Sequence, residues 1–188
     1  MREYIENIAG SIPDEDWVLY EEHLKVKTAK KGEIILSRNK SCSTIWHMTK
    51  GAVRKFELDN GVEKTTHFYM APKIFTVLDS ALTGNLSDLA IICEEDCEFL
   101  ELDIKLLQKL YNRSIYIERI GRRMVEEEFI AEFSMRRMFL KLDATQRYEY
   151  MEKNHTEIMQ RFQLKDLATF LGVTPETLSR LRRMRLII

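Results

Sequence analysis

Residues Leu164 to Met184 read LKDLATFLGVTPETLSRLRRM, two short amphipathic segments on either side of a Gly-Val-Thr turn. In the first segment the apolar residues fall at helical spacing. Gly172 can then supply the left-handed conformation that ends a helix at little cost. Thr174 is suited to the N-cap of a second helix, and Pro175 to its first position, where a missing N–H is harmless. The stretch therefore predicts a helix-turn-helix.

The outer face of the second predicted helix is chemically suited to DNA. Glu176, Arg180 and Arg183 follow one another at intervals of four and three, so they share one stripe. Arginine can bind guanine through two hydrogen bonds, and glutamate can accept one from cytosine. Thr174 and Thr177, with the helix N-terminus, can contact phosphate. We therefore expect DNA to be bound by Thr174, Glu176, Thr177, Arg180 and Arg183. Non-specific attraction is expected from Arg182, Arg183 and Arg185.

The rest of the chain is not basic. The 188 residues carry a formal net charge of −1, with 45% hydrophobic and 31% charged residues. From Arg161 onward, six Lys or Arg residues stand against two acidic ones, so a basic segment follows an acidic body. This asymmetry favours a polyanionic partner for the basic segment. The alternative is a helical hairpin whose arginines are merely solvated.

Several features favour a cytoplasmic protein without a membrane partner. The first residues, Met-Arg-Glu-Tyr-Ile-Glu-Asn, lack the apolar core of a signal peptide. No apolar run approaches the ~20 residues of a membrane span. Cys42, Cys93 and Cys97 are an odd number at undistinguished spacing, so we expect reduced thiols.

The body of the chain is rich in short β patterns. Between about residues 24 and 103 these runs alternate with turn signals, and Asp59-Asn60-Gly61 is a strong hairpin signal. Many short strands at this spacing predict an antiparallel roll. The runs are LKVKTA, EIILS, STIWHMT, AVRKFEL, VEKTTHFYM, LAIICE and CEFLELD. Residues 1–23 before them have helical spacing, with a second helix starting at Pro13.

A long helix follows the roll. The stretch from about residue 114 to 142 is nearly free of Gly and Pro and predicts a helix of about 28 residues, about 42 Å long. Its apolar residues recur in steps of three, four or seven and form a heptad-like seam. The seam consists of Ile117, Ile120, Met124, Ala131 and Met138. Phe129, Phe133 and Phe139 widen the apolar surface beyond what a small roll would cover. We expect a homodimerisation helix, and a helix packed on its own roll is the alternative.

The predicted fold class is α+β, in three parts. Residues 1–112 hold an N-terminal helix and the antiparallel β-roll. Residues 113–142 form the dimerisation helix, and residues 143–188 hold the helix-turn-helix.

This order of parts resembles the Crp–Fnr family of bacterial transcription regulators over essentially the whole chain. The segments that carry the resemblance are IWHMTKGAVR (45–54), IICEEDCE (91–98) and GVTPETLSR (172–180). The last is the most specific, because it matches the front of the family's recognition helix. The resemblance implies base contacts for Glu176 and Arg180 and backbone contacts near Thr174 and Thr177. Pro175 departs from the family pattern, since proline cannot read a base edge by hydrogen bond.

The nucleotide pocket of the family is degenerate in this sequence. Cyclic-nucleotide-binding members carry Phe-Gly-Glu and then an Arg-Ser/Thr-Ala segment, whose glutamate and arginine hold the ribose and the cyclic phosphate. Here no Lys or Arg occurs between Lys73 and Lys105, so a buried phosphate would lack a cation. We expect no useful binding of cAMP or cGMP. The corresponding pocket residues are Phe75, Asp79, Ser80, Ser87 and Asp88.

Other sensors of the family use an iron–sulfur cluster or haem. A cluster needs about four cysteines close together, whereas this chain has three in total. His47 and His67 are lone strand histidines, which more often lie at the surface or in the core than on a haem. We expect no metal and no cofactor. For Cys93 and Cys97, a redox role and ordinary packed thiols both stay open.

Taken together, the sequence predicts a homodimeric DNA-binding transcription regulator for a pseudo-palindromic site. RNA polymerase is a candidate further partner, and the sequence identifies no small-molecule effector. We expect no enzyme, because a Gly-rich phosphate loop, a His-x-x-x-His pair and a nucleophile elbow are all missing. The alternative is an interaction module whose roll binds a metabolite or protein and whose C-terminal helices dock a partner. Only residues 186–188 follow the second helix, so we expect the family's small β wing to be absent or reduced.

Overall fold

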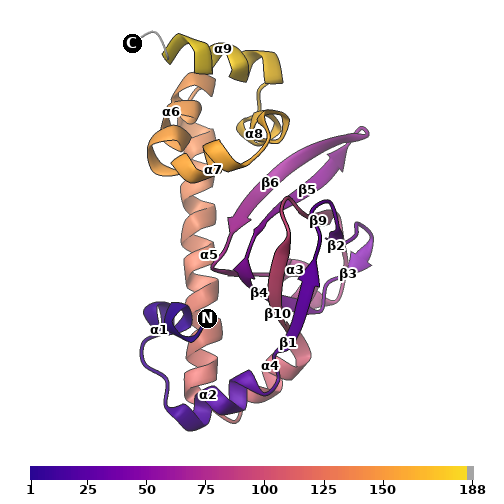
Figure 1. Ribbon diagram of the computed structural model, residues 1–188, viewed down its shortest axis with the longest axis vertical. Coiled ribbons are helices and arrows are strands. Elements are labelled where there is room, and N and C mark those ends of the chain that lie inside the picture. Colours follow the sequence, from indigo (N-terminus) through magenta and orange to yellow (C-terminus); the bar gives the residue numbers. More distant parts are fainter. Residues whose placement is uncertain (186–188) are drawn as a thin grey trace.

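The computed structural model describes residues 1–185. The expectation that the family's β wing is absent or reduced concerns residues 186–188, which lie outside the described part. Helix α5 (Ile115–Lys141) runs along the length of the molecule, with the β-roll beside it (Figure 1). At one end lie α1 (Arg2–Ala9), α2 (Asp14–Glu21) and α4 (Ile104–Tyr111). At the other end lie α6 (Ala144–Asn154), α7 (Thr156–Arg161), α8 (Leu164–Leu171) and α9 (Pro175–Arg185). The α+β fold predicted from the sequence is confirmed.

The roll is built from two four-stranded antiparallel sheets and one short strand pair within the described residues. The first sheet has the order β1 (Lys25–Ala29), β10 (Cys97–Asp103), β4 (Thr44–Lys50) and β7 (Lys73–Phe75). The second has the order β2 (Ile34–Leu36), β9 (Leu89–Cys93), β5 (Ala52–Asp59) and β6 (Val62–Met70). The separate pair is β3 (Lys40–Ser41) and β8 (Leu86–Ser87), with α3 (Leu78–Thr83) just before β8.

The predicted hairpin joins β5 to β6. Asn60 and Gly61 occupy its tip with φ of 51° and 82°, the left-handed values that an Asn-Gly turn accommodates. All seven predicted runs form strands. The elements that the pattern did not predict include β3, β7, β8, α3 and α7, which span two to six residues each. Such short pieces carry no measurable periodicity.

The long helix has a clear start and a close neighbour. The Ser114 side chain caps it, with Oγ accepting from the backbone N–H of Tyr116 at 3.1 Å and of Ile117 at 3.2 Å. Gly121 lets α4 pack tightly against α5, because a Cβ there would lie 1.9 Å from the Tyr111 hydroxyl. Glycine at this position therefore fixes the helix against the base of the roll.

Part of the predicted dimer seam is covered by the chain itself. Ile117 and Ile120 are 0% and 1% exposed in the core of the roll, and Met138 is 3% exposed among the C-terminal helices. Met124 is half-buried against the first core, and Ala131 is exposed. This corrects the dimer contact predicted for Ile117, Ile120 and Met138, which are covered by the chain itself because α5 packs along one side against both the roll and the C-terminal helices.

Most exposed apolar residues of α5 lie on the opposite side of the helix, at about 100° per residue. They include Val125, Phe129, Ile130, Phe133 and Leu140, each between 46% and 74% exposed. Aromatic residues in such a stripe are unusual on a helix that faces only water. The structure thus separates an inward apolar side of α5 from an outward one, which the sequence pattern had combined.

The C-terminal helices share a core with the roll. Buried residues of α6, α7, α8 and α9 cluster with Ala52 of β5 and Phe68 of β6. The Phe68 ring lies 4.3 Å from the Phe162 ring and 5.2 Å from the Phe170 ring, centroid to centroid. In residues 1–185, no helix is long and apolar enough to cross a membrane.

Candidate nucleic-acid interface

Helices α8 and α9 form the predicted helix-turn-helix. Gly172 ends α8 in the left-handed conformation, with φ of 70°. Thr174 then caps α9, and its Oγ1 accepts from the backbone N–H of Thr177 at 3.2 Å. Leu167 and Ala168 of α8 and Leu178 of α9 are fully buried where the two helices meet. The small side chain of Ala168 allows this close approach.

The outer face of α9 is open to solvent. Glu176, Thr177, Arg180 and Arg183 line one shallow hollow together with Met184. Within the described residues, neither arginine makes a hydrogen bond or an ion pair, so both side chains can meet a ligand. Glu176 lies at the helix N-terminus, where its own backbone N–H and the Thr174 hydroxyl lower the pKa of its carboxyl. At neutral pH this face therefore offers two cations and one carboxylate.

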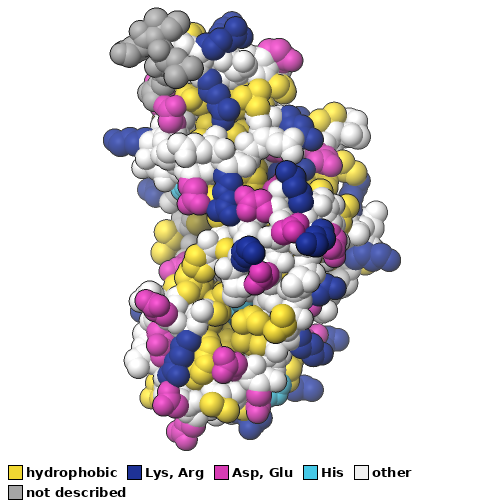
Figure 2. All heavy atoms as spheres, in the orientation of Figure 1, with side chains coloured by type: hydrophobic (Ala, Val, Ile, Leu, Met, Phe, Trp, Pro, Cys, Tyr) yellow, Lys and Arg dark blue, Asp and Glu magenta, His cyan; other side chains and the backbone are white. Residues whose placement is uncertain are grey.

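Not every predicted arginine faces outward. The Arg182 guanidinium donates from Nη2 to the Met159 carbonyl of α7 at 2.8 Å. Arg182 thus ties α9 to α7, which corrects its expected part in non-specific attraction to DNA. The side chain of Arg185 lies outside the described part of the chain. In Figure 2, Lys and Arg side chains are visible at the end formed by these helices, and acidic ones gather over the N-terminal helices at the opposite end.

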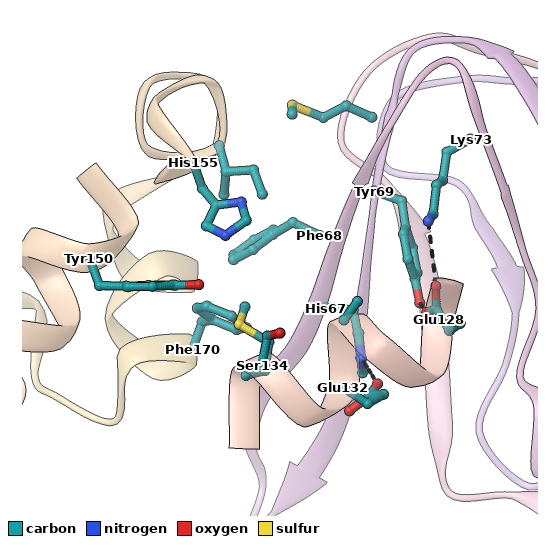
Figure 3. A pocket seen from close by; sticks show the side chains of 14 residues that line it. His67, Phe68, Tyr69, Lys73, Glu128, Glu132, Ser134, Tyr150, His155 and Phe170 are labelled. Atoms are coloured by element: carbon teal, nitrogen blue, oxygen red, sulfur yellow. Dashed lines mark hydrogen bonds and ion pairs between the residues drawn. The ribbon is translucent and has the colours of Figure 1, made fainter. Parts of the chain in front are cut away.

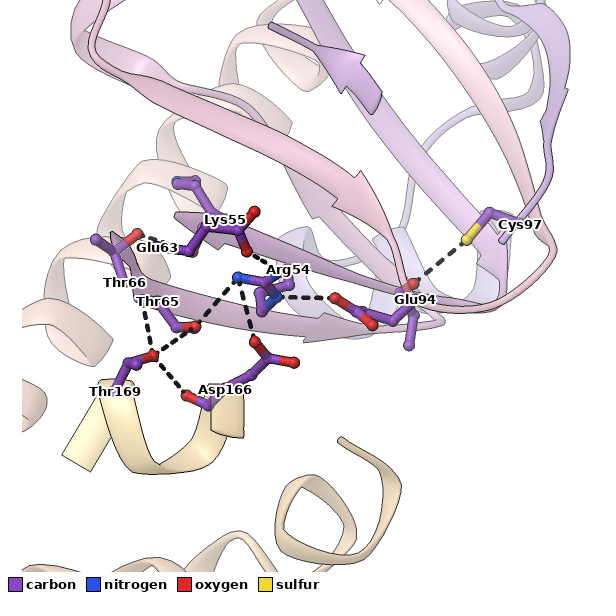
Figure 4. Close-up of polar contacts among 10 residues, drawn as sticks. Arg54, Lys55, Glu63, Thr65, Thr66, Glu94, Cys97, Asp166 and Thr169 are labelled. Atoms are coloured by element: carbon purple, nitrogen blue, oxygen red, sulfur yellow. Dashed lines mark hydrogen bonds and ion pairs between the residues drawn. The ribbon is translucent and has the colours of Figure 1, made fainter. Parts of the chain in front are cut away.

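A buried ion cluster positions the helix-turn-helix on the roll (Figure 4). Arg54 of β5 is 3% exposed and donates to Glu63 at 2.6 Å and to Glu94 at 2.8 Å. Its Nη1 also lies 3.5 Å from Asp166 of α8, which is 4% exposed. Burial raises the pKa of the Asp166 carboxyl, and the Arg54 charge opposes that shift. The cluster therefore holds the first helix of the motif against the sheet.

Two further contacts reinforce this docking, one between neutral groups and one an ion pair. The Thr65 N–H of β6 donates to Thr169 Oγ1 of α8 at 3.2 Å. Arg161 of α7 makes a two-point ion pair with Glu95 in the β9–β10 turn, at 2.6 and 2.8 Å. The hydrogen bond from Arg161 lowers the pKa of Glu95. Sequence reasoning found none of these partners, because they lie 66 to 104 residues apart.

The predicted nucleotide pocket is divided between core and surface. Phe75 is 3% exposed and stacks on Tyr69 with centroids 4.9 Å apart. Ser80 is buried, and its Oγ accepts from the Cys42 N–H at 2.9 Å and donates to the Asn85 carbonyl at 2.6 Å. Ser87 is also buried and bonded to the backbone, whereas Asp79 and Asp88 are exposed. The five residues thus present no common polar site.

The roll also contains a buried lysine that the sequence analysis did not single out. Lys55 of β5 is 6% exposed, and its Nζ donates to Tyr69 Oη at 3.1 Å and to the Thr76 carbonyl at 3.3 Å. Burial lowers its pKa, and the negative charge of Glu128 on α5 opposes that shift. Lys55 lies outside the span between Lys73 and Lys105, where the family pattern places its phosphate-binding arginine, so the pattern does not point to it.

The cavity beside Phe75, one of the predicted pocket residues, is small. The cavity lined by Ile74, Phe75 and Met124 has a volume of about 70 Å³, whereas ligand pockets usually exceed about 300 Å³.

Cys93 and Cys97 are buried as free thiols, and their mutual hydrogen bond and burial raise the pKa of Cys93. That keeps its thiol protonated.

Known structures were compared with this geometry. No family model and no curated protein matches the sequence. The structure is similar to FixK2 from Bradyrhizobium japonicum, with a TM-score of 0.71 and 19% identity over 86% of this chain and 83% of that one. It is also similar to the c-di-GMP-responsive global regulator CLP of Xanthomonas campestris, with a TM-score of 0.70 and 15% identity over 93% and 92% of the two chains. The chain has a Crp–Fnr-like fold.

A third comparison supports the same statement. A transcriptional regulator of the Crp/Fnr family from Eubacterium rectale matches with a TM-score of 0.69 and 17% identity, over 94% of this chain and 84% of that one. Because these matches extend over nearly the whole chain, the Crp–Fnr-like fold includes the roll, the long helix and the C-terminal helices together. The resemblance stated from the sequence is therefore confirmed at the level of the fold.

Proposed function

We propose that this protein is a sequence-specific DNA-binding transcription regulator that acts as a homodimer and is not an enzyme. One observation carries the proposal: α9, the second helix of a helix-turn-helix, exposes Arg180 and Arg183 on the same outer face as Glu176. Arg180 and Glu176 read base edges in the major groove. Thr174, Thr177 and Arg183 contact phosphates.

The proposed dimer uses the outward side of α5. Val125, Phe129, Ile130 and Phe133 are apolar and exposed over about two and a half turns of this helix. A second copy packed there about a two-fold axis would bury these side chains and set the two recognition helices on successive half-sites, about 34–36 Å apart. A two-fold arrangement of this kind reads a pseudo-palindrome. RNA polymerase is the further partner that such a regulator would contact from the DNA, inside the cytoplasm.

The roll does not take cAMP or cGMP in this proposal. The buried Lys55 ammonium is already bonded to Tyr69 and Thr76, and the nearby charged side chains include Glu128, Glu132 and Asp79. Carboxylates around the only buried ammonium of the described roll disfavour a cyclic phosphate. Exclusion of the nucleotide thus follows from charge as well as from the small cavity beside Phe75.

The test is selection of binding sites from random duplex DNA at about 0.15 M salt, with Arg180→Ala and Arg183→Ala alongside. We expect a two-fold-symmetric motif for the unaltered protein. Arg180→Ala should weaken binding to that site by ~1–3 kcal/mol and relax one position, because a bidentate contact to guanine is lost. Arg183→Ala should weaken all sequences nearly alike and flatten the salt dependence by about one unit.

The comparison has a matched control on the roll. Lys30→Ala removes an exposed lysine that is paired with Asp96, and it should leave DNA binding unchanged. If no motif is enriched, or if Arg180→Ala and Arg183→Ala behave identically on selected and random DNA, the assigned roles are wrong. An interaction module whose C-terminal helices dock a protein would then be the better description.

A further inference from the structure

A cavity of about 410 Å³ separates the roll from the C-terminal helices. Its walls come from β6, α5 and the helices of the helix-turn-helix region, with His155, Tyr150 and Phe170 on one side and His67 and Tyr69 on the other (Figure 3). The cavity lies apart from the outer face of α9. The proposed DNA binding does not involve this cavity, and the sequence pattern does not predict it.

Three potential metal ligands meet at one wall of this cavity. His67 projects from β6, and Glu128 and Glu132 project from the same side of α5, four residues apart. One ligand atom from each lies within 4.8 Å of the other two. An ion held at about 2.0–2.2 Å by each ligand keeps ligand atoms within about 4 Å of one another. Small side-chain rotations are therefore enough to close the three groups around one ion.

The surroundings of the three groups support coordination. Tyr69 Oη donates to Glu128 Oε1 at 2.5 Å, the kind of outer hydrogen bond that orients a ligating carboxylate. His67 Nε2 pairs with Glu132 Oε1, and Nδ1 of the same ring has no hydrogen-bond partner among the described residues. Nδ1 can therefore carry the proton while Nε2 coordinates. Lys73 Nζ lies 3.5 Å from Glu128 Oε2 and competes with a metal for that oxygen.

We propose that His67, Glu128 and Glu132 form a binding site for a divalent first-row transition-metal ion. One imidazole and two carboxylates suit Zn²⁺ or Fe²⁺ better than Mg²⁺ or Ca²⁺, which prefer all-oxygen sites. Three protein ligands leave coordination positions open, and all three line the cavity, so those positions face it. The ion links strand β6 of the roll to helix α5 close to the docked helix-turn-helix.

The site is tested with Zn²⁺ on the full chain, by competition against a chromophoric chelator. We expect one ion per chain. His67→Ala and Glu132→Gln should each weaken the affinity by more than about tenfold, and Tyr69→Phe by about tenfold through the lost outer hydrogen bond. Lys73→Met should tighten binding, because it frees the second oxygen of Glu128. This gain in affinity is an outcome that general damage to the fold would not produce.

Matched variants and a second metal complete the test. His155→Gln lines the same cavity outside the three ligands, and Glu126→Gln lies on the same helix, so both should bind Zn²⁺ like the unaltered protein. Co²⁺ should give visible bands without a thiolate charge-transfer band, since Cys42, Cys93 and Cys97 take no part. Binding that survives His67→Ala combined with Glu132→Gln, or that shows thiolate ligation, overturns the proposal. The measurement involves no DNA, so its failure and that of the proposed function are separable.

Discussion

A single buried histidine predicts how the roll responds to acid. His47 of β4 is 0% exposed, and its Nδ1–H donates to the Leu100 carbonyl at 3.0 Å. Nε2 must then accept, and the Tyr20 hydroxyl donates to it at 2.6 Å. Burial lowers the pKa of His47 from 6.5 to about 4. The neutral ring is thus part of the fold and joins the N-terminal helix α2 to the sheet.

The sign of the pH effect follows from this lowered pKa. Between pH 6.5 and about 4 the unfolded chain binds a proton at His47 that the folded chain does not, so stability falls as the pH falls. We expect this group alone to lower the free energy of unfolding by about 3 kcal/mol across that window. His47→Asn should be less stable at pH 7 but show a shallower pH dependence in urea denaturation. An unchanged slope would place the titrating group elsewhere.

Residue types show what sequence can and cannot reveal at this scale. Gly172, Thr174 and Pro175 are placed by local backbone chemistry, and the structure has each in the predicted role at the turn. Arg182 looked like its neighbours in the sequence, yet it turns inward to the Met159 carbonyl. That orientation depends on where α7 packs, which the spacing along α9 does not encode.

At the scale of the element, helix α5 gives a direct prediction. Its outward stripe contains Phe129 and Phe133, 61% and 48% exposed, with ring centroids 4.7 Å apart. Buried aromatic residues at the centre of an interface typically contribute 2 kcal/mol or more each. Phe133→Glu should therefore weaken the proposed dimer by about thirtyfold or more. Sedimentation equilibrium over a range of concentrations would measure it, with DNA affinity falling in parallel.

Val18→Glu is the matched control for this substitution. Val18 is an apolar residue of α2 that is 59% exposed and does not belong to the outward stripe of α5, so the charge there should leave the association state unchanged. A dimer that persists in Phe133→Glu would assign the subunit contact to another surface. Loss of helix content in the circular dichroism spectrum would instead mean that Phe133 supports the fold of the single chain, which would contradict its exposed position in α5.

The same helix explains why periodicity alone misassigned the dimer seam. A run of apolar residues at Ile117, Ile120 and Met124 predicts a helix correctly, whatever covers it. Which partner covers it is decided by tertiary packing, and here the roll does so. Strands were easier to predict, because alternation over five to nine residues and an Asn-Gly turn are local signals. The strands of two or three residues lack such signals.

At the scale of the whole molecule, the feature hidden from the sequence is the docking of the helix-turn-helix on the roll. Thr65 and Thr169 are 104 residues apart in the chain yet in contact. The Arg54 cluster joins β5 to α8, and Phe68 of β6 lies in the core of the C-terminal helices. In the sequence, each of these residues looks like an ordinary strand or helix residue. The contacts between them determine where the outer face of α9 points relative to the roll.

Arg54→Met tests whether this docking is a main support of the structure. The substitution leaves Asp166 and Glu94, 5% and 12% exposed at the side chain, without their shared cation. Removing one partner of a buried ion cluster costs about 3–5 kcal/mol, because the remaining charges stay desolvated. We expect a loss of that size in urea denaturation. Arg122→Met, which breaks exposed ion pairs with Glu118 and Glu126, should stay within about 1 kcal/mol.

Where that loss appears in the molecule follows from the position of the cluster. Only α8 is held through Asp166, so backbone amides of α8 should exchange with solvent faster in Arg54→Met, while those of β4 and β10 in the core of the roll keep their protection. Hydrogen exchange resolved by segment would measure both. Asp166→Asn combined with Arg54→Met should recover part of the loss, since the uncompensated carboxylate is gone. Equal acceleration of α8 and β10 would instead mean that the two bodies unfold as one unit, and that the cluster supports the roll and the helix-turn-helix alike.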